Sequence, residues 1–261
     1  MTEVNYLESL NPLQYESVCS TEGPNLIIAG AGTGKTKVLT TRVAHIIDNN
    51  LAFPSQILCV TFTNKAAREM SERVQKLVSQ NMEKMPWMGT FHSIGAKIIR
   101  NHAEVIGLKQ SFTILDKDDQ LSLIKQIIKA ENLDQSQFSP KLIQSKIDHW
   151  KNKALNPNDI KSESLDNLVD EKSLSIYKIY QARLFEINCL DFGDLLLQCI
   201  NLFKVTDIHK RYSNNFKYIH VDEYQDTNAA QYKWLKLLGS HHQNVCCVGD
   251  DDQSIYSWRG A

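Results

Sequence analysis

The sequence predicts an α/β protein in which a parallel sheet is interrupted by a helical insertion, and the order of its apolar segments carries this prediction. Near the start of the chain, two short apolar runs, 25–29 and 56–61, are each followed by a helical pattern. Runs this short and continuous are typical of strands covered on both faces of a parallel sheet. Two more apolar runs, 218–223 and 244–249, flank an amphipathic helix near 229–238. Strands and helices therefore alternate at both ends of the chain.

The middle of the chain lacks this alternation. Charged helical segments occupy 117–133 and 172–187, and the segment between them is rich in turn and cap residues. We therefore expect a discontinuous sheet domain formed by residues 1–103 and 191–261, with residues 104–190 as an inserted, all-helical subdomain.

Composition and charge narrow the class of protein. The 261 residues are 42% hydrophobic and 23% charged, and no apolar run approaches the ~20 residues that a membrane-spanning helix needs. The amino-terminal MTEVNYLESL has neither the basic nor the apolar part of a secretion signal, so we expect a cytoplasmic protein with no membrane partner. Six cysteines without C-x-x-C spacing favour reduced packing residues over zinc ligands or disulfides. The formal net charge is −1, so nucleic-acid binding requires local patches.

A glycine-rich turn follows the first predicted strand. Phosphate binding needs unobstructed backbone N–H groups at the start of a helix, and the three glycines of this turn give that freedom. Lys35 is placed to reach the β- and γ-phosphates of a nucleotide, and the Thr36 hydroxyl to ligate Mg²⁺. Ala29 replaces the first glycine of the usual G-x-x-x-x-G-K-[ST] pattern, where a methyl group is tolerated if φ stays negative. The predicted loop comprises Ala29, Gly30, Ala31, Gly32, Thr33, Gly34, Lys35 and Thr36.

Two carboxylates end the predicted strand at 218–223. Side chains alternate along an extended strand, so Asp222 is expected in the Mg²⁺ shell while Glu223 accepts a proton from the attacking water. Such a pair alone is usually a solvated strand end, and the glycine loop is what favours catalysis. The separation of 187 positions from Lys35 to Asp222 is too long for an uninterrupted nucleotide-binding core, which supports the helical insertion.

Seven ordered segments carry a resemblance to a known family. They are LNPLQ (10–14), AGAGTGKT (29–36), VTFTNKAAREM (60–70), GTFHS (89–93), DFGDLL (191–196), VDEYQDT (221–227) and VGDDDQSIYSWRGA (248–261). In their order and in their residues they resemble the successive motifs of the superfamily-1 DNA helicases of the UvrD, Rep and PcrA group. The resemblance covers the whole chain and implies a RecA-like P-loop NTPase domain that uses ATP and Mg²⁺. Alanine at the start of the loop is similar to the form this family uses.

The resemblance implies further roles around the nucleotide. Gln14 is similar to the glutamine that reads adenine with its amide, and Lys37 stands where the family commonly has an arginine that stacks on adenine. An ammonium group stacks less well than a guanidinium group, so looser purine selectivity is expected. Gln253 falls where the family senses the γ-phosphate, and Arg259 where it links the nucleotide to the DNA groove. The expected catalytic residues are Glu223, Lys35, Gln253 and Arg259.

The resemblance also implies a DNA-binding face. The family's single-strand contacts fall on Phe62, Thr63, Asn64, Thr90, His92, Tyr256 and Trp258. Aromatic faces that stack on bases give a sequence-tolerant grip, although without the resemblance Phe62 and Trp258 would be interpreted as core aromatics. The expected partners are single-stranded DNA and junctions of single- and double-stranded DNA, with 3′-to-5′ travel. A second RecA-like domain with arginine fingers, which these residues lack, is expected in the full-length protein.

Two alternatives stay open, and one further signal is weak. A P-loop ATPase unrelated to DNA would show no DNA-dependent change in turnover. A non-hydrolysing nucleotide- or DNA-binding module would show no rate that depends on Glu223.

Five lysines between Lys141 and Lys161, with Trp150 among them, fit either a duplex-DNA contact or an ordinary solvated face.

Overall fold

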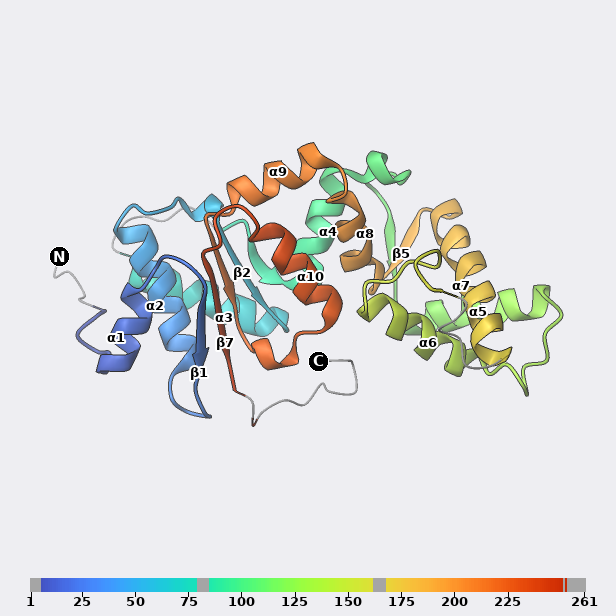
Figure 1. The fold of residues 1–261 in the computed structure, drawn as a ribbon, viewed down its shortest axis with the longest axis horizontal. Helices are drawn as coiled ribbons and strands as arrows, with labels where there is room; N and C mark the ends of the chain where they lie inside the picture. Colours follow the sequence, from blue (N-terminus) through green and yellow to red (C-terminus); the bar gives the residue numbers. More distant parts are fainter. Residues whose placement is uncertain (1–5, 79–84, 162–167, 251, 253–261) are drawn as a thin grey trace.

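The chain forms a five-stranded parallel sheet, which a computed structural model describes for residues 6–78, 85–161, 168–250 and 252 (Figure 1). Its strands, in spatial order, are β1 (Asn25–Ile28), β7 (Val245–Gly249), β6 (Tyr218–Val221), β2 (Ile57–Thr61) and β3 (Met88–Thr90). The α/β fold class is confirmed, as are the four strands expected from apolar runs. β3 was not expected, because three residues are too few to show a period.

The sheet is covered by helices on both faces, and each face has its own hydrophobic core. On one face lie α2 (Lys35–Asp48) and α3 (Asn64–Leu77), with α1 (Pro12–Cys19) packed against α2. The other face is covered by α4 (Phe91–Asn101), α8 (Asp194–Leu202), α9 (Thr206–Asn215) and the expected α10 (Ala229–Leu238). Trp234 of α10 is fully buried there, and its Nε1–H donates to Cys199 Sγ at 3.1 Å. Burial of a large apolar side chain contributes ~1.5–3 kcal/mol, so these two layers hold the sheet rigid.

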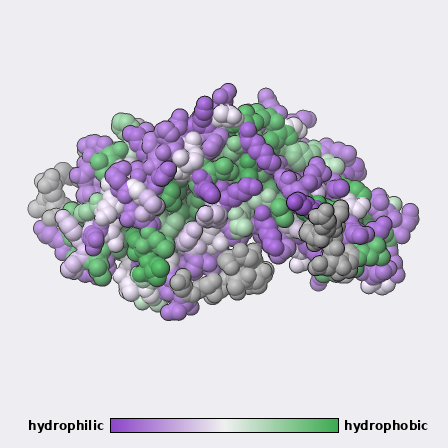
Figure 2. Space-filling model, in the orientation of Figure 1, coloured by the Kyte–Doolittle hydropathy of each residue, from purple (hydrophilic) through white to green (hydrophobic). Residues whose placement is uncertain are grey.

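β1 differs from the expectation of a strand covered on both faces. Leu26 and Ile28 are 61% and 63% exposed, whereas every residue of β2 and β6 is buried. β1 is the edge strand of the sheet, and no helix of the described residues covers this side of it. Figure 2 shows a largely hydrophilic surface on which hydrophobic side chains gather over β1.

Between α4 and α8 the chain leaves the sheet and forms a helical region at the opposite end of the molecule from α1 (Figure 1). Its helices are α5 (Lys117–Ala130), α6 (Pro140–Asn152) and α7 (Leu168–Glu186), which enclose a separate core. β4 (Thr113–Leu115) and β5 (Cys189–Asp191) pair in parallel where the chain enters and leaves this region. We propose these helices as the inserted subdomain, with its second boundary inside β5.

Short 3₁₀ turns complete the secondary structure: η1 (Pro54–Gln56), η2 (Ala103–Ile106) and η4 (Tyr224–Asp226). All six cysteines are free thiols in the structure. Among the described residues, no helix combines the length and the apolar character needed to cross a membrane.

Candidate nucleotide and DNA site

The glycine-rich turn connects the end of β1 to the first residue of α2. Gly32 and Gly34 have φ of +74° and +89°, a left-handed conformation that strains any residue with a side chain. A Cβ atom added to Gly30 or Gly32 would meet no protein atom within 4 Å, so the backbone of the loop is open to a ligand. Ala29 keeps a negative φ, and its N–H extends the strand pairing by donating to Gly249 O at 3.1 Å. Alanine at this position therefore fits the loop without strain.

Lys35 forms an ion pair with Asp250 across the end of the sheet. The Nζ–Oδ2 distance is 3.0 Å, and the side chains are 10% and 6% exposed. Asp250 directly follows β7, and the pair forms because β7 lies beside β1. Asp250 was missed from the sequence, although a polar residue at the end of an apolar strand next to glycine was a usable signal.

The two carboxylates after β6 have different environments. Asp222 is buried, and its Oδ1 has no hydrogen-bond partner in the described part of the chain. Burial, followed by the charge of Glu223, raises the pKa of Asp222 to about 6. β6 already ends at Val221, and Glu223 has a left-handed φ of +52°. A sharp turn, and not strand alternation as expected, therefore separates the two carboxylates.

Two further predicted nucleotide residues lie against the loop. Gln14 Nε2 donates to Thr33 O at 2.9 Å, while Gln14 Oε1 accepts from Asn11 N at 3.1 Å. Both ends of this amide have protein partners, so pairing with adenine requires exchange of at least one of these bonds. Lys37 Nζ donates to Ser9 O at 2.6 Å on the exposed side of α2.

The predicted DNA residues that follow β2 and those at the end of β3 come from neighbouring strands, because Thr61, which precedes Phe62, and Thr90 are register partners in the parallel sheet. The half-buried Phe62 ring rests 5.5 Å from Phe91. The Thr90 hydroxyl accepts from Ser93 N and begins α4, so its role in the fold is that of a cap.

Helix α3 begins in the same way. The Thr63 hydroxyl accepts from Ala66 N at 3.1 Å, and Asn64 is the exposed first residue of the helix. His92 packs edge-on against Phe192, 5.7 Å away, a ring that is 53% exposed and that sequence reasoning missed. Gln253, Tyr256, Trp258 and Arg259 lie outside the described residues.

Comparison with known proteins decides the family. The family described as UvrD/REP helicase N-terminal domain matches residues 10–261. The chain belongs to this family. It is 48% identical to the probable DNA helicase II homolog of Rickettsia conorii and 49% identical to the DNA helicase II of Rickettsia typhi, in each case over 100% of the chain and 40% of the relative. It is 49% identical to the ATP-dependent DNA helicase PcrA of Staphylococcus aureus, over 98% of the chain and 35% of that relative. The chain thus spans two fifths or less of these relatives.

In this member of the UvrD/REP family, two of the five lysines between positions 141 and 161 serve the fold. Lys151 is fully buried and forms ion pairs with Asp191 and Asp194, and Lys146 pairs with Asp170. Trp150 stacks on Tyr177 with 5.8 Å between ring centroids. The lysines of this run that are exposed are Lys141, Lys153 and Lys161.

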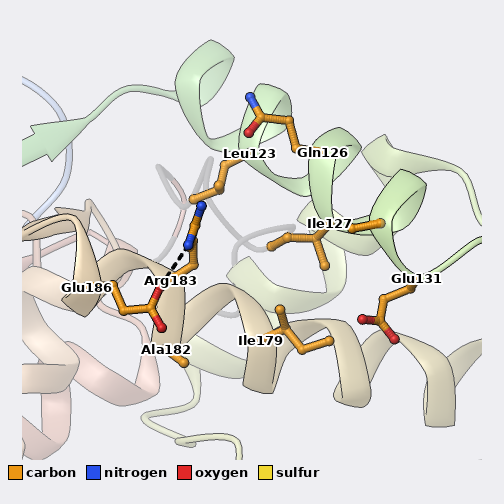
Figure 3. A pocket seen from close by; sticks show the side chains of 9 residues that line it. Leu123, Gln126, Ile127, Glu131, Ile179, Ala182, Arg183 and Glu186 are labelled. Carbon is orange, nitrogen blue, oxygen red and sulfur yellow. Dashed lines mark hydrogen bonds and ion pairs between the residues drawn. The ribbon is translucent and has the colours of Figure 1, made fainter.

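A groove of about 560 Å³ is lined by residues of α5 and α7 (Figure 3), at the opposite end of the molecule from α1 (Figure 1). Its floor is apolar, and at one end Arg183 Nη1 pairs with Glu186 Oε2 at 2.9 Å. These charges neutralise each other, and the other polar side chains labelled in Figure 3, Gln126 and Glu131, lie apart from one another. The groove therefore does not have the character of a catalytic site.

Proposed function

We propose that this chain is the first motor domain of an ATP-dependent DNA helicase, which binds MgATP at the ends of β1, β6 and β7 and single-stranded DNA beside it. One observation carries the proposal. The loop lysine, two carboxylates and the DNA-contact candidates all follow the carboxyl ends of strands in one parallel sheet, which is where such folds bind ligands. Work on DNA also fits the cytoplasmic location expected from the sequence.

The residues present fit a nucleotide triphosphate with Mg²⁺. The open glycine backbone at the start of α2 suits phosphate oxygens, and Asp222 Oδ1 is a buried acceptor with no protein donor among the described residues. We propose that the Thr36 hydroxyl and Asp222 hold Mg²⁺, partly through water. When bound there, the cation would offset the negative charge that develops on the phosphates.

Lys35 has two competing partners in this scheme. Its ammonium group holds Asp250 at 3.0 Å and is also the loop cation within reach of the β- and γ-phosphates. We propose that it shifts from the carboxylate toward the phosphates, while Glu223 takes a proton from the attacking water. Gln14 and Lys37 then flank the base, since both already contact the segment around the loop.

The DNA side of the proposal depends on exposed rings. Phe192 is accessible and braced by His92, and the half-buried Phe62 is braced by Phe91. Base stacking on such rings contributes ~1–3 kcal/mol per base without sequence preference. The family resemblance adds 3′-to-5′ travel and a second RecA-like domain that supplies arginine fingers.

The test is ATP turnover by the full protein that carries these residues, with and without single-stranded DNA. The proposal expects stimulation by DNA, and loss of turnover in both Lys35→Ala and Glu223→Gln. Turnover unaffected by DNA would favour a P-loop ATPase unrelated to DNA, and turnover indifferent to Glu223 would favour a binding module. Residues 1–261 alone are expected not to displace a strand from a 3′-tailed duplex, because closure on ATP needs both domains.

A further inference from the structure

We infer that Gln225 is a positioning residue for the hydrolysis proposed above: its amide ties Glu223 to the backbone of Asp250, the partner of Lys35. The inference rests on the proposed function, because it assigns Glu223 a reacting water. It concerns a residue that the seven motifs contain but to which no role in the reaction has been given.

The geometry links both sides of the nucleotide site through one side chain. Gln225 Nε2 donates to Glu223 Oε2 at 2.8 Å, and Gln225 Oε1 accepts from the Asp250 N–H at 3.0 Å. The Asp250 carboxylate in turn holds Lys35 at 3.0 Å. A continuous chain of polar contacts, here called the Gln225 bridge, therefore runs from the general base to the phosphate-binding lysine.

Glu223 needs such a restraint because its backbone does not supply one. Its φ of +52° places it in a left-handed turn after β6 ends, a conformation that residues with a side chain rarely adopt. The Glu223 side chain is only half-buried, and the hydrogen bond from Gln225 restrains its rotamer. A general base must lie within about 3.2 Å of the water that it deprotonates, so a loose rotamer costs rate.

Only an amide side chain completes the bridge. It must donate to a carboxylate at one end and accept from a backbone N–H at the other, and glutamine does both. Glutamate in its place accepts from Asp250 but presents a second negative charge to Glu223. Methionine has a similar length but neither donates nor accepts with comparable strength.

Gly249 supports this assignment independently. A Cβ atom at Gly249 would lie 2.8 Å from Gln225 Oε1, closer than real Cβ contacts come. The φ of Gly249 is not in the left-handed region, so what a larger residue would meet first is the far end of the Gln225 side chain, which an added Cβ would displace. The absence of a side chain at Gly249, the final residue of β7, thus leaves space for the Gln225 amide.

The experiment compares Gln225→Met, Gln225→Glu and Gly249→Ala in the full protein, with DNA-stimulated ATP hydrolysis as the readout. We expect kcat to fall ~10–100-fold in each, as for a misplaced catalytic group, with KM for ATP and the affinity for DNA nearly unchanged. The Gln225→Met/Gly249→Ala double variant should be no slower than Gln225→Met, because both act on the bridge. Gln231→Met is the matched control, since Gln231 Oε1 accepts from Asn228 N at 2.8 Å in a helix cap away from the site.

A second readout does not need hydrolysis. In residues 1–261, hydrogen exchange of the Asp250 amide should speed up in Gln225→Met and stay protected in Gln225→Glu. Unchanged kcat in Gln225→Met, an equal loss in Gln231→Met, or a rise in KM in place of a fall in kcat would overturn the inference. If Glu223→Gln itself left hydrolysis intact, the proposed function would fail instead, whereas loss in Glu223→Gln without loss in Gln225→Met rejects Gln225 alone.

Discussion

Two lysine–aspartate arrangements among the described residues, one around Lys151 and one around Lys35, differ in how completely their polar atoms are hydrogen-bonded. Lys151 lies between Asp191 and Asp194 at 2.7 and 2.8 Å, with all three side chains at most 4% exposed. Tyr180 OH also donates to Asp191 Oδ2, at 2.9 Å. In the described part of the chain Lys35 forms an ion pair with one carboxylate, that of Asp250, beside a loop whose backbone is open.

The two lysines differ in their roles: the ion pairs of Lys151 stabilise the fold, whereas the surroundings of Lys35 fit a binding site. Donors reach all four carboxylate oxygens of Asp191 and Asp194, from a lysine, a tyrosine, glutamines and two backbone N–H groups. Near Lys35, by contrast, Asp222 Oδ1 is buried without a hydrogen bond in the described part of the chain. Satisfied charges fix the fold, whereas an unsatisfied buried acceptor beside an open loop is poised for a ligand.

The largest expected effect breaks the structural network. Lys151→Ala leaves two buried carboxylates without their cation, so the free energy of unfolding should fall by ~3–5 kcal/mol in urea denaturation. Burial lowers the pKa of Lys151, but Asp191 and Asp194 outweigh burial and raise it overall. This stabilisation should therefore be fully present below the ordinary lysine pKa and be lost only as the pH rises through the raised value. A loss below 1 kcal/mol would show that the network is dispensable.

The corresponding change at the other lysine should affect function and not folding. Lys35→Ala is expected to lower kcat of the full protein by ~10²–10³-fold, because the cation that meets the developing phosphate charge is gone. Its urea midpoint should move far less than that of Lys151→Ala. If Lys35→Ala and Lys151→Ala destabilised the fold equally, the assignment of Lys35 to function and of Lys151 to the fold would be wrong.

A third substitution should trade activity for stability. The pKa of Asp222 is raised from 3.8 to about 6, so its ionised form is disfavoured in the folded protein. Asp222→Asn should stabilise the fold by up to ~3 kcal/mol well above pH 6. This gain should shrink as the pH falls through 6 and vanish only below the ordinary aspartate pKa of 3.8, where the wild-type carboxyl becomes protonated in both states. The same variant should weaken the Mg²⁺ dependence of ATP binding. A less stable Asp222→Asn would contradict the unsatisfied state of this carboxylate.

The smallest effect is expected on the DNA side. Phe192→Ala should weaken binding of a short single-stranded oligonucleotide by ~1–3 kcal/mol, measured by fluorescence titration at low salt. Phe53→Ala is a control, because Phe53 is 74% exposed and follows α2, on a different part of the surface. Loss of affinity in the control alone would place the DNA elsewhere.

Much of this arrangement follows from local sequence, and the rest depends on the order of strands in space. The apolar runs and the glycine loop predict β1, β2, β6, β7 and the start of α2, because backbone burial and turn chemistry are local. The Lys35–Asp250 pair joins residues 215 positions apart and exists only because β7 inserts beside β1. The burial of Lys151 likewise depends on β5 and α8 meeting α6, so its lysine run resembled a solvated face.

The central claim is that the glycine loop and Lys35, at the carboxyl ends of the strands, bind MgATP, whereas the ion pairs of Lys151 serve the fold. Calorimetric titration of residues 1–261 with ATP, in the presence and absence of Mg²⁺, tests it most directly, with Lys35→Ala beside the wild type. Binding is expected to be weak, to strengthen with Mg²⁺, and to be lost or greatly weakened in Lys35→Ala. Equal affinity in both proteins, or binding indifferent to Mg²⁺, would contradict the assignment.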